Sequence, residues 1–236
     1  MHNTLTLNLP NIRQISLKTK FNLKIFWVLN FVLVILLLTF YIFYLNLIFT
    51  ETSLFFISQN KMNIVMDIGE NFLMKKTAEL LINENDDFLE IGFGMGMLAD
   101  FAQEKNLKSH TIVEGHPIVY EKLLEWSKNK KNVIPIFGDW YSVIDLIKQK
   151  NYDSVYFDTH CDENVFQFLK LILPNIKENG RYSRYGLSKK NNIDLFNKEV
   201  SYTNMKFVSE DDYEVTPHEV VIEFTGKTFP ICILQK

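Results

Sequence analysis

Apolar residues follow two alternating spacings from about residue 62 to the C-terminus. Met74, Ala78 and Leu81 recur on one face of a helix, with Ile82 beside them, which predicts an amphipathic helix. Short apolar runs separated by further helical patterns predict parallel strands. The predicted strands cover residues 88–91, 110–114, 133–137, 155–157 and 181–185, and an antiparallel pair covers residues 220–224 and 230–234.

This alternation of strands and helices is typical of one α/β domain. We expect residues 62–236 to form a Rossmann-like, seven-stranded and mostly parallel sheet with an antiparallel C-terminal strand. Pro135 lies inside a predicted strand, and because proline has no amide hydrogen it indicates an edge strand or a bulge. The 236 residues are 47% hydrophobic and 22% charged, which is enough apolar surface for a folded core.

The first 60 residues differ in composition from the rest of the chain. Residues 25–49 contain no charged side chain and, at ~1.5 Å per residue, would as a helix cross a ~30 Å hydrocarbon core. They predict an N-terminal hydrophobic helix that acts as a single-pass membrane anchor. The basic residues before this segment would keep the N-terminus in the cytoplasm; they are Arg13, Lys18, Lys20 and Lys24.

A second interpretation removes residues 1–60 from the native protein. They contain no Gly, Ala or Asp, a mixture that AT-rich non-coding DNA would encode, and Met62 or Met66 could start the domain. An anchor in the orientation above would place the domain outside the cytoplasm, where we expect its cofactor. Both interpretations stay open; a cytoplasmic protein is the prediction and a membrane-anchored one the alternative.

Charge and cysteine content argue against several classes of protein. The formal net charge of −3 argues against nucleic acid as a partner, because phosphate binding favours a basic surface. Cys161 and Cys232 lack the spacing of a zinc site or a disulfide framework, which favours two reduced thiols. Residues 160–163 are His, Cys, Asp and Glu, but four consecutive residues rarely converge on one ion. We therefore expect no metal.

A glycine-rich turn follows the first predicted strand of the domain. It consists of Glu90, Ile91, Gly92, Phe93, Gly94, Met95, Gly96 and Met97. Glycines here let the backbone bend sharply and approach a ligand, and the next helix directs free N–H groups toward it. Met97 stands where a dinucleotide-binding motif has glycine. Glu114 ends the next strand, where an acid can accept hydrogen bonds from ribose. Together these features predict S-adenosylmethionine rather than NAD.

The loop after the third strand carries Gly138, Asp139 and Trp140. In this architecture that loop lies beside the adenine. Asp139 could accept a hydrogen bond from an exocyclic amine, and Trp140 offers a flat stacking face. Ordinary core packing is the alternative for Trp140.

Two carboxylates are candidates for the catalytic site. Asp158 ends the fourth strand, at the sheet edge where ligands of such folds bind. Glu70 opens the helix before the first strand and could cover the same pocket, although an acid is also favoured there by the helix dipole. Two carboxylates would suit a cationic, planar guanidinium group.

Four blocks in this order resemble guanidinoacetate N-methyltransferase and the δ-nitrogen protein arginine methyltransferases. The blocks are residues 65–74 (VMDIGENFLM), 89–96 (LEIGFGMG), 138–140 (GDW) and 156–159 (YFDT). The resemblance runs from about Val65 to the C-terminus. It implies a methyltransferase that transfers a methyl group from S-adenosylmethionine to a guanidino nitrogen.

The resemblance also implies roles for particular residues. The cofactor site would be lined by residues 92–97, by Glu114, Gly115 and His116, and by Asp139 and Trp140, with Glu90 and Asp158 beside them. Met66, Met74, Glu70 and Asp158 would border the methyl-transfer pocket. Thr159 and the loop Gly186-Leu187-Ser188-Lys189 would contact the substrate.

Three departures from the family pattern concern the acceptor side of the pocket. His160 stands where an aromatic ring usually follows the Asp-Thr pair, Gly69 replaces a tryptophan before Glu70, and Lys189 replaces a small hydroxyl residue. The family's aromatic N-terminal lid has no clear counterpart in residues 1–60. The prediction is an N-methyltransferase for a small guanidino compound or for protein arginine. The alternatives are a methyltransferase for another small molecule and a catalytically silent, membrane-tethered cofactor-binding module.

Overall fold

The computed structural model describes residues 25–37, 47–51, 53–58, 61–160, 164–187, 193–203, 205–214 and 228–236. The chain divides into two compact units, residues 1–46 and residues 47–236. In the first unit, residues 25–37 form a helix with nearly all of its large apolar side chains exposed. Within the described ranges, no helix has both the length and the apolar character needed to cross a membrane.

The predicted hydrophobic helix over residues 25–49 is wrong at its C-terminal end. Leu47–Phe49 form strand β1, which pairs antiparallel with β2 (Ser53–Ser58). Leu47 and Phe49 pack against the first hydrophobic core described below. Core packing and pairing with β2 therefore favour a strand at residues 47–49, where the apolar composition had predicted a helix.

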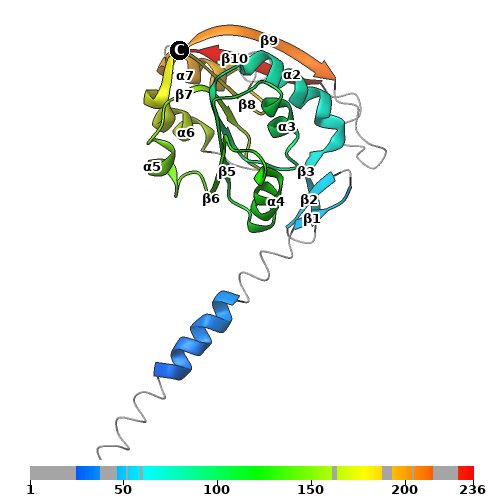
Figure 1. Cartoon of the computed structure of the whole chain (residues 1–236), viewed down its shortest axis with the longest axis vertical. Coiled ribbons are helices and arrows are strands. Elements are labelled where there is room, and N and C mark those ends of the chain that lie inside the picture. The colour runs from blue at the N-terminus through cyan, green and yellow to red at the C-terminus, as the bar shows by residue number, and fades with distance from the viewer. Residues whose placement is uncertain are drawn as a thin grey trace, which may run out of the picture. The chain divides into compact units, whose positions relative to one another are not determined.

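The second unit contains a seven-stranded sheet in the order β6-β5-β4-β7-β8-β10-β9 (Figure 1). The strands are β4 (Asp87–Ile91), β5 (Ser109–Glu114), β6 (Val133–Phe137), β7 (Tyr152–Phe157), β8 (Ile176–Arg184), β9 (Lys206–Glu214) and β10 (Thr228–Gln235). The strands from β6 to β8 are parallel, and β10 is antiparallel to both of its neighbours. The predicted Rossmann-like class and the antiparallel C-terminal strand are confirmed.

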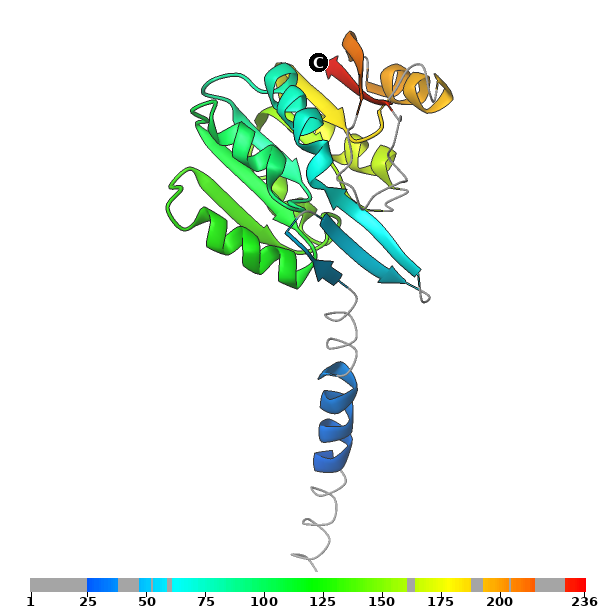
Figure 2. The ribbon, with the colours of Figure 1, turned by 90° about the vertical axis from the view of Figure 1, so that its right-hand side faces the viewer.

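Helices cover both faces of this sheet (Figures 1 and 2). The helices are α2 (Asn71–Leu81), α3 (Met97–Gln103), α4 (Pro117–Ser127), α5 (Ile144–Ile147), α6 (Val165–Ile172) and α7 (Ile193–Thr203). One hydrophobic core joins the sheet to α2, α3 and α4, and the other joins it to α5, α6 and α7. β4 is buried throughout, with Phe88 in the first core and Leu89 and Ile91 in the second, as the two-residue period of a strand requires.

Two further predictions concern the edge strands of the sheet. Pro135 lies in β6, which is an edge strand, so its missing amide hydrogen costs no ladder bond on the open side. The partners of β10 are β8 and β9 rather than the predicted strand at residues 220–224, which lies outside the described residues. The polar, acid-rich sequence of β9 concealed it, and its described side chains, Lys206, Phe207 and Val208, are exposed at the edge of the sheet.

A small antiparallel sheet precedes the domain helix α2. It consists of β1, β2 and β3 (Lys61–Asp67) in that order, followed by the short 3-10 helix η1 (Ile68–Glu70) (Figure 2). Leu54 of β2 is buried in the first core, and the Ser53 hydroxyl donates a hydrogen bond of 2.7 Å to Asp67 Oδ2. Residues 47–58 are thus part of the compact second unit.

Candidate active site

A cavity of about 1030 Å³ opens at the carboxyl ends of β4, β5, β6 and β7. Backbone hydrogen bonds continue the sheet past the strand ends and hold the loops together: Gly92 N–H donates to Val113 O, and Asp158 N–H donates to Ile91 O, both at 2.8 Å. Thirteen of the predicted site residues line the cavity. They are Met66, Met74, Glu90, Gly92, Phe93, Gly94, Glu114, Gly115, His116, Asp139, Trp140, Asp158 and Thr159.

The glycine turn requires glycine for two separate reasons. Gly92, Gly94 and Gly96 have φ values of +90°, +56° and +80°, a backbone region that other residues rarely adopt. A Cβ atom on Gly92 would also lie 1.8 Å from the carbonyl oxygen of Asp158. The turn therefore packs directly on the loop after β7, which brings Asp158 beside the glycine-rich backbone.

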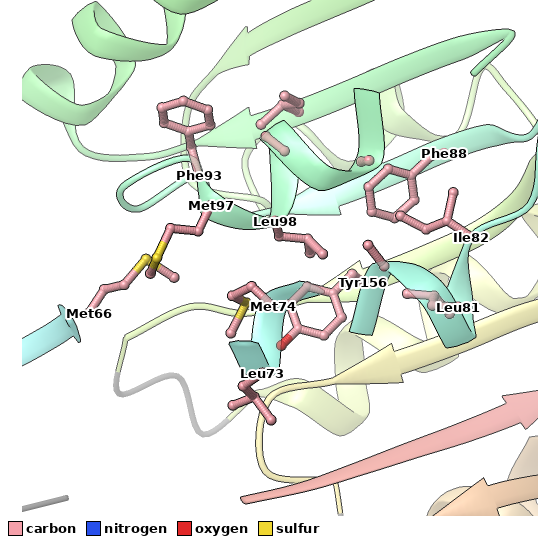
Figure 3. Packing of buried hydrophobic residues seen from close by; sticks show 14 of the residues in the cluster. Met66, Leu73, Met74, Leu81, Ile82, Phe88, Phe93, Met97, Leu98 and Tyr156 are labelled. Atoms are coloured by element: carbon pink, nitrogen blue, oxygen red, sulfur yellow. The ribbon is translucent and has the colours of Figure 1, made fainter. Parts of the chain in front are cut away.

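Met66 covers the glycine turn from the end of β3 (Figure 3). Its sulfur accepts a hydrogen bond of 3.2 Å from the backbone N–H of Met95. A Cβ atom on Gly94 would lie 2.9 Å from the same sulfur. β3 thus forms one wall of the cavity, as expected for Met66.

Glu114 is fixed at the tip of β5 by backbone donors. Its two carboxylate oxygens accept hydrogen bonds from Phe93 N–H at 3.0 Å and from His116 N–H at 2.6 Å. Burial raises the pKa of Glu114, and the backbone N–H groups oppose that rise. The carboxylate is therefore held rigidly at the edge of the cavity, in the position predicted for contact with a ribose.

The loop after β6 places Asp139 and Trp140 differently. Asp139 lines the cavity and its Oδ1 accepts a hydrogen bond of 2.9 Å from Tyr141 N–H. Trp140 is 4% exposed and packs edge-on against Phe157 and Phe168 in the second core. Trp140 therefore combines the predicted place on the cavity wall with the core packing that was its alternative.

Glu90 lies deeper, in a buried polar chain. Its Oε2 lies 2.7 Å from Nε2 of His110, whose Nδ1 lies 3.1 Å from the side-chain amide of Gln103. Burial and then the nearby charge of Asp158 raise the pKa of Glu90 well above its usual range. Burial lowers the pKa of His110 to about 3, so the imidazole is neutral at physiological pH.

Asp158 and Glu70 lie close enough for the charge of Glu70 to act on Asp158. Burial, followed by the charge of Glu70, raises the pKa of Asp158 to about 7. Burial likewise raises the pKa of Glu70 to about 7, while hydrogen bonds from Asp67 N–H and Tyr185 lower it. Burial and the two carboxylates raise the pKa of Tyr185, so its hydroxyl remains a donor. The arrangement is a pair of carboxyl groups, one of which, Glu70, accepts a hydrogen bond from the phenol of Tyr185.

Several predicted site residues do not reach the cavity. Glu70 is 3% exposed, caps η1 by accepting a hydrogen bond from Asp67 N–H at 3.0 Å, and is absent from the wall. Met95, Gly96 and Met97 are also absent: Gly96 begins α3 and Met97 is part of the first core. Leu187 is buried in the second core, and Ser188 lies outside the described residues.

Sequence reasoning missed several residues of the wall, among them five that come from β1 to β3 or follow β8. Leu47, Leu54 and Phe56 come from β1 and β2, Asn63 comes from β3, and Tyr185 follows β8. The position of Tyr185 after a parallel strand was a usable signal. The residues of β1 and β2 were concealed because their apolar run continues the hydrophobic segment before them.

An aromatic pair lies at His160, one of the departures from the family pattern. The ring of His160 lies 6.1 Å from that of Phe56 in β2, centroid to centroid. Burial lowers the pKa of His160. Phe56 of β2 therefore places an aromatic ring beside His160. It comes from residues 1–60, in which the sequence showed no clear counterpart of the family's aromatic lid.

The residues of the cavity fit S-adenosylmethionine. The glycine turn offers bare backbone, Glu114 offers fixed acceptors for hydroxyl groups, and Asp158 and Glu90 offer acidic groups toward a cation. The Thr159 hydroxyl is buried and has no hydrogen-bond partner within the described part of the chain, as expected where a ligand supplies the partner.

This strand order, with a glycine turn at the tip of β4 and a fixed acid at the tip of β5, defines the class of S-adenosylmethionine-dependent methyltransferases. The chain belongs, within that class, to the guanidinoacetate N-methyltransferase family, whose sequence model matches residues 57–176.

Curated relatives of the chain are fungal proteins named protein arginine N-methyltransferase 2. That of Candida glabrata is 33% identical over 153 residues, which are 59% of this chain and 36% of the relative. That of Kluyveromyces lactis is 27% identical over 170 residues, which are 66% of this chain and 42% of the relative. The chain thus matches well under half the length of these two relatives.

Solved structures support the same fold. The crystal structure of M. jannaschii TYW2 in complex with AdoMet has a TM-score of 0.53 at 18% identity, over 80% of this chain and 87% of that one. A methyltransferase from Pyrococcus furiosus has a TM-score of 0.53 at 16% identity, over 70% and 82%. At these identities the similarity shows the fold alone.

Proposed function

We propose that this chain is an S-adenosylmethionine-dependent N-methyltransferase for a guanidino nitrogen, in a small guanidinoacetate-like molecule or in protein arginine. The observation that carries this proposal is the pair of carboxyl groups of Asp158 and Glu70, with Tyr185 hydrogen-bonded to Glu70 and Asp158 beside the glycine turn. Near pH 7 each of these carboxyl groups is about half neutral. A ligand with a delocalised positive charge would stabilise their ionised form and would itself be bound more tightly.

The cavity residues divide between two ligands in this proposal. Residues of the glycine turn, Glu114 to His116 and Asp139 would hold the cofactor, with Trp140 closing the wall behind it. Asp158 and Thr159 would contact the acceptor. Glu70 is not on the wall, so we assign it a positioning role, exerted through Tyr185 and through its charge.

The chemistry asked of the protein is orientation and proton transfer. When bound, the cofactor supplies the methyl group from its sulfonium, and the electron pair of the broken S–C bond stays on sulfur. Asp158 orients the acceptor so that its nitrogen lone pair faces that methyl carbon in line. As the new N–C bond forms, the Asp158 carboxylate accepts the proton that the nitrogen loses. Tyr185 donates a hydrogen bond to Glu70 and keeps that carboxyl in place.

The test is methyl transfer by the full chain to guanidinoacetate, to free arginine and to arginine-containing peptides. Asp158→Asn should lower kcat at least about hundredfold, the usual contribution of a general base, while S-adenosylhomocysteine still binds. Glu70→Gln should have a smaller effect on kcat and weaken acceptor binding. Unchanged turnover in Asp158→Asn would refute the assignment, and turnover of none of the three acceptors would refute the guanidino substrate.

The extent of the catalytic domain is part of the proposal. We place it at residues 47–236, fifteen residues before the start expected from the sequence pattern, because β1 and β2 supply residues of the cavity wall. We place its activity in the cytoplasm, where the cofactor is expected.

A further inference from the structure

Gln103, His110 and Glu90 form a hydrogen-bonded chain of polar side chains within the apolar core. Gln103 lies at the end of α3, His110 in β5 and Glu90 in β4, so three separate elements contribute. His110 and Glu90 are 0% and 1% exposed. The His110 ring packs against Phe88, with centroids 4.8 Å apart, and edge-on against Trp126. A polar chain in such an apolar setting costs free energy unless each group is satisfied.

The contacts assign the proton on the imidazole. The neutral ring of His110 has one N–H group and one acceptor nitrogen. The side-chain nitrogen of Gln103 can only donate, so Nδ1 of the neutral ring is the acceptor and Nε2 carries the hydrogen that faces Glu90 Oε2. This chain fixes the position of Oε2 and leaves the second carboxyl oxygen of Glu90 for the cavity.

The place of Glu90 on the wall indicates which part of a ligand it faces. Glu114 lies at the tip of the neighbouring strand, and both of its oxygens are engaged by backbone donors. Glu90 lies on the same wall, and only its Oε2 is engaged, by His110. Glu90 is therefore available to a different part of the ligand from the ribose that Glu114 is expected to contact.

We propose that His110 and Gln103 are positioning residues that hold Glu90 so that its free oxygen accepts a hydrogen bond from the ammonium group of the cofactor's amino-acid part. This inference rests on the cofactor class of the proposed function and is independent of the methyl acceptor. His110 holds Glu90 by donating a hydrogen bond to it. Removing this donor would therefore weaken binding of the cofactor's amino-acid part and leave binding of its nucleoside part unchanged.

The experiment compares two ligands by calorimetry on the full chain: S-adenosylhomocysteine, which has the amino-acid part, and 5′-methylthioadenosine, which lacks it. His110→Phe keeps a ring between Phe88 and Trp126 but removes the donor to Glu90. It should weaken S-adenosylhomocysteine about tenfold and change 5′-methylthioadenosine by less than about twofold. Gln103→Leu should act in the same direction and more weakly.

Tyr152→Phe is the matched control. It removes another buried hydrogen bond of the sheet, from Tyr152 Oη to Ile147 O at 2.8 Å, away from Glu90. It should lower the thermal stability without changing the ratio of the two affinities. Equal weakening of both ligands in His110→Phe, or weakening of neither, would overturn the inference. Wild-type binding of S-adenosylhomocysteine without any methyl transfer would refute the guanidino function alone, and no binding would refute both proposals.

Discussion

Gly92 and Gly186 have similar backbone conformations but different surroundings. Their φ values are +90° and +69°. A Cβ atom on Gly92 would lie 1.8 Å from the Asp158 carbonyl oxygen, whereas one on Gly186 meets nothing within 4 Å. The pair therefore separates the cost of an unfavourable φ from the cost of a close approach between two backbones.

We predict that Gly186→Ala lowers the free energy of unfolding by about 1–2 kcal/mol, the cost of left-handed backbone alone. Gly92→Ala should lower it by at least about 3 kcal/mol, because the turn and the β7 loop must also move apart. Urea unfolding of both variants measures the difference. Equal losses would show that the turn tolerates displacement from Asp158.

The two carboxyls of the acceptor side should make stability depend on pH. The pKa values of Glu70 and Asp158 are raised from 4.5 and 3.8 to about 7. Between about pH 4.5 and 7 the folded state therefore binds more protons than the unfolded state, so the free energy of unfolding falls as pH rises. One such shift corresponds to on the order of 3 kcal/mol.

The measurement is urea unfolding of the ligand-free chain between pH 5 and pH 8. The wild type should be less stable at pH 8, and the double variant Glu70→Gln, Asp158→Asn should show a shallower fall. Other buried carboxyls, Glu90 and Glu114, have raised pKa values as well and keep some slope in the variant. An identical slope in the two proteins would contradict the assigned shifts.

The hairpin of β1 and β2 is the element whose role the sequence concealed most. It buries Leu54, which is 1% exposed, and contributes Leu47 and Phe56 to the cavity wall. It is joined to η1 through the hydrogen bond from Ser53 to Asp67. A chain that begins at Met62 would retain the central sheet but would open the cavity on this side.

We therefore predict different behaviour for two truncations. A chain starting at Leu47 should bind S-adenosylhomocysteine like the full chain. A chain starting at Met62 should bind it at least about tenfold more weakly and unfold at a lower temperature, because the apolar surface under Leu54 becomes exposed. Calorimetric titration and thermal unfolding test this. Equal affinity of the two truncations would show that the hairpin is dispensable for the site.

The thermal stability of the whole molecule should increase with the demethylated cofactor product and should not change with a dinucleotide. A ligand at 100 times its Kd stabilises a folded protein by ~2.7 kcal/mol, which raises Tm by roughly 5–10 °C for a domain of this size. S-adenosylhomocysteine should produce such a shift in thermal unfolding, and NAD should produce none. A shift with NAD of similar size would overturn the assignment based on the glycine spacing.

Local sequence patterns predicted the central elements well. The glycine turn after β4 was visible because only glycine satisfies its φ values, and β4, β5 and β7 were visible because each contains a short group of apolar residues that is buried in the sheet. The acidic strand β9 and the hairpin were missed. β9 lies at a sheet edge, where burial imposes little pattern, and the hairpin shares its apolar character with the segment before it.

The sequence by itself determined the fold class, the turn and the acids at the strand tips, because strand period, glycine conformation and strand-end position are local properties. Only the tertiary structure decided that Glu70 lies behind Tyr185 and off the cavity wall. It also joined Gln103, His110 and Glu90 in one chain and brought Phe56 to His160. Those contacts link residues of separate elements, and they depend on how the elements pack, which no local pattern encodes.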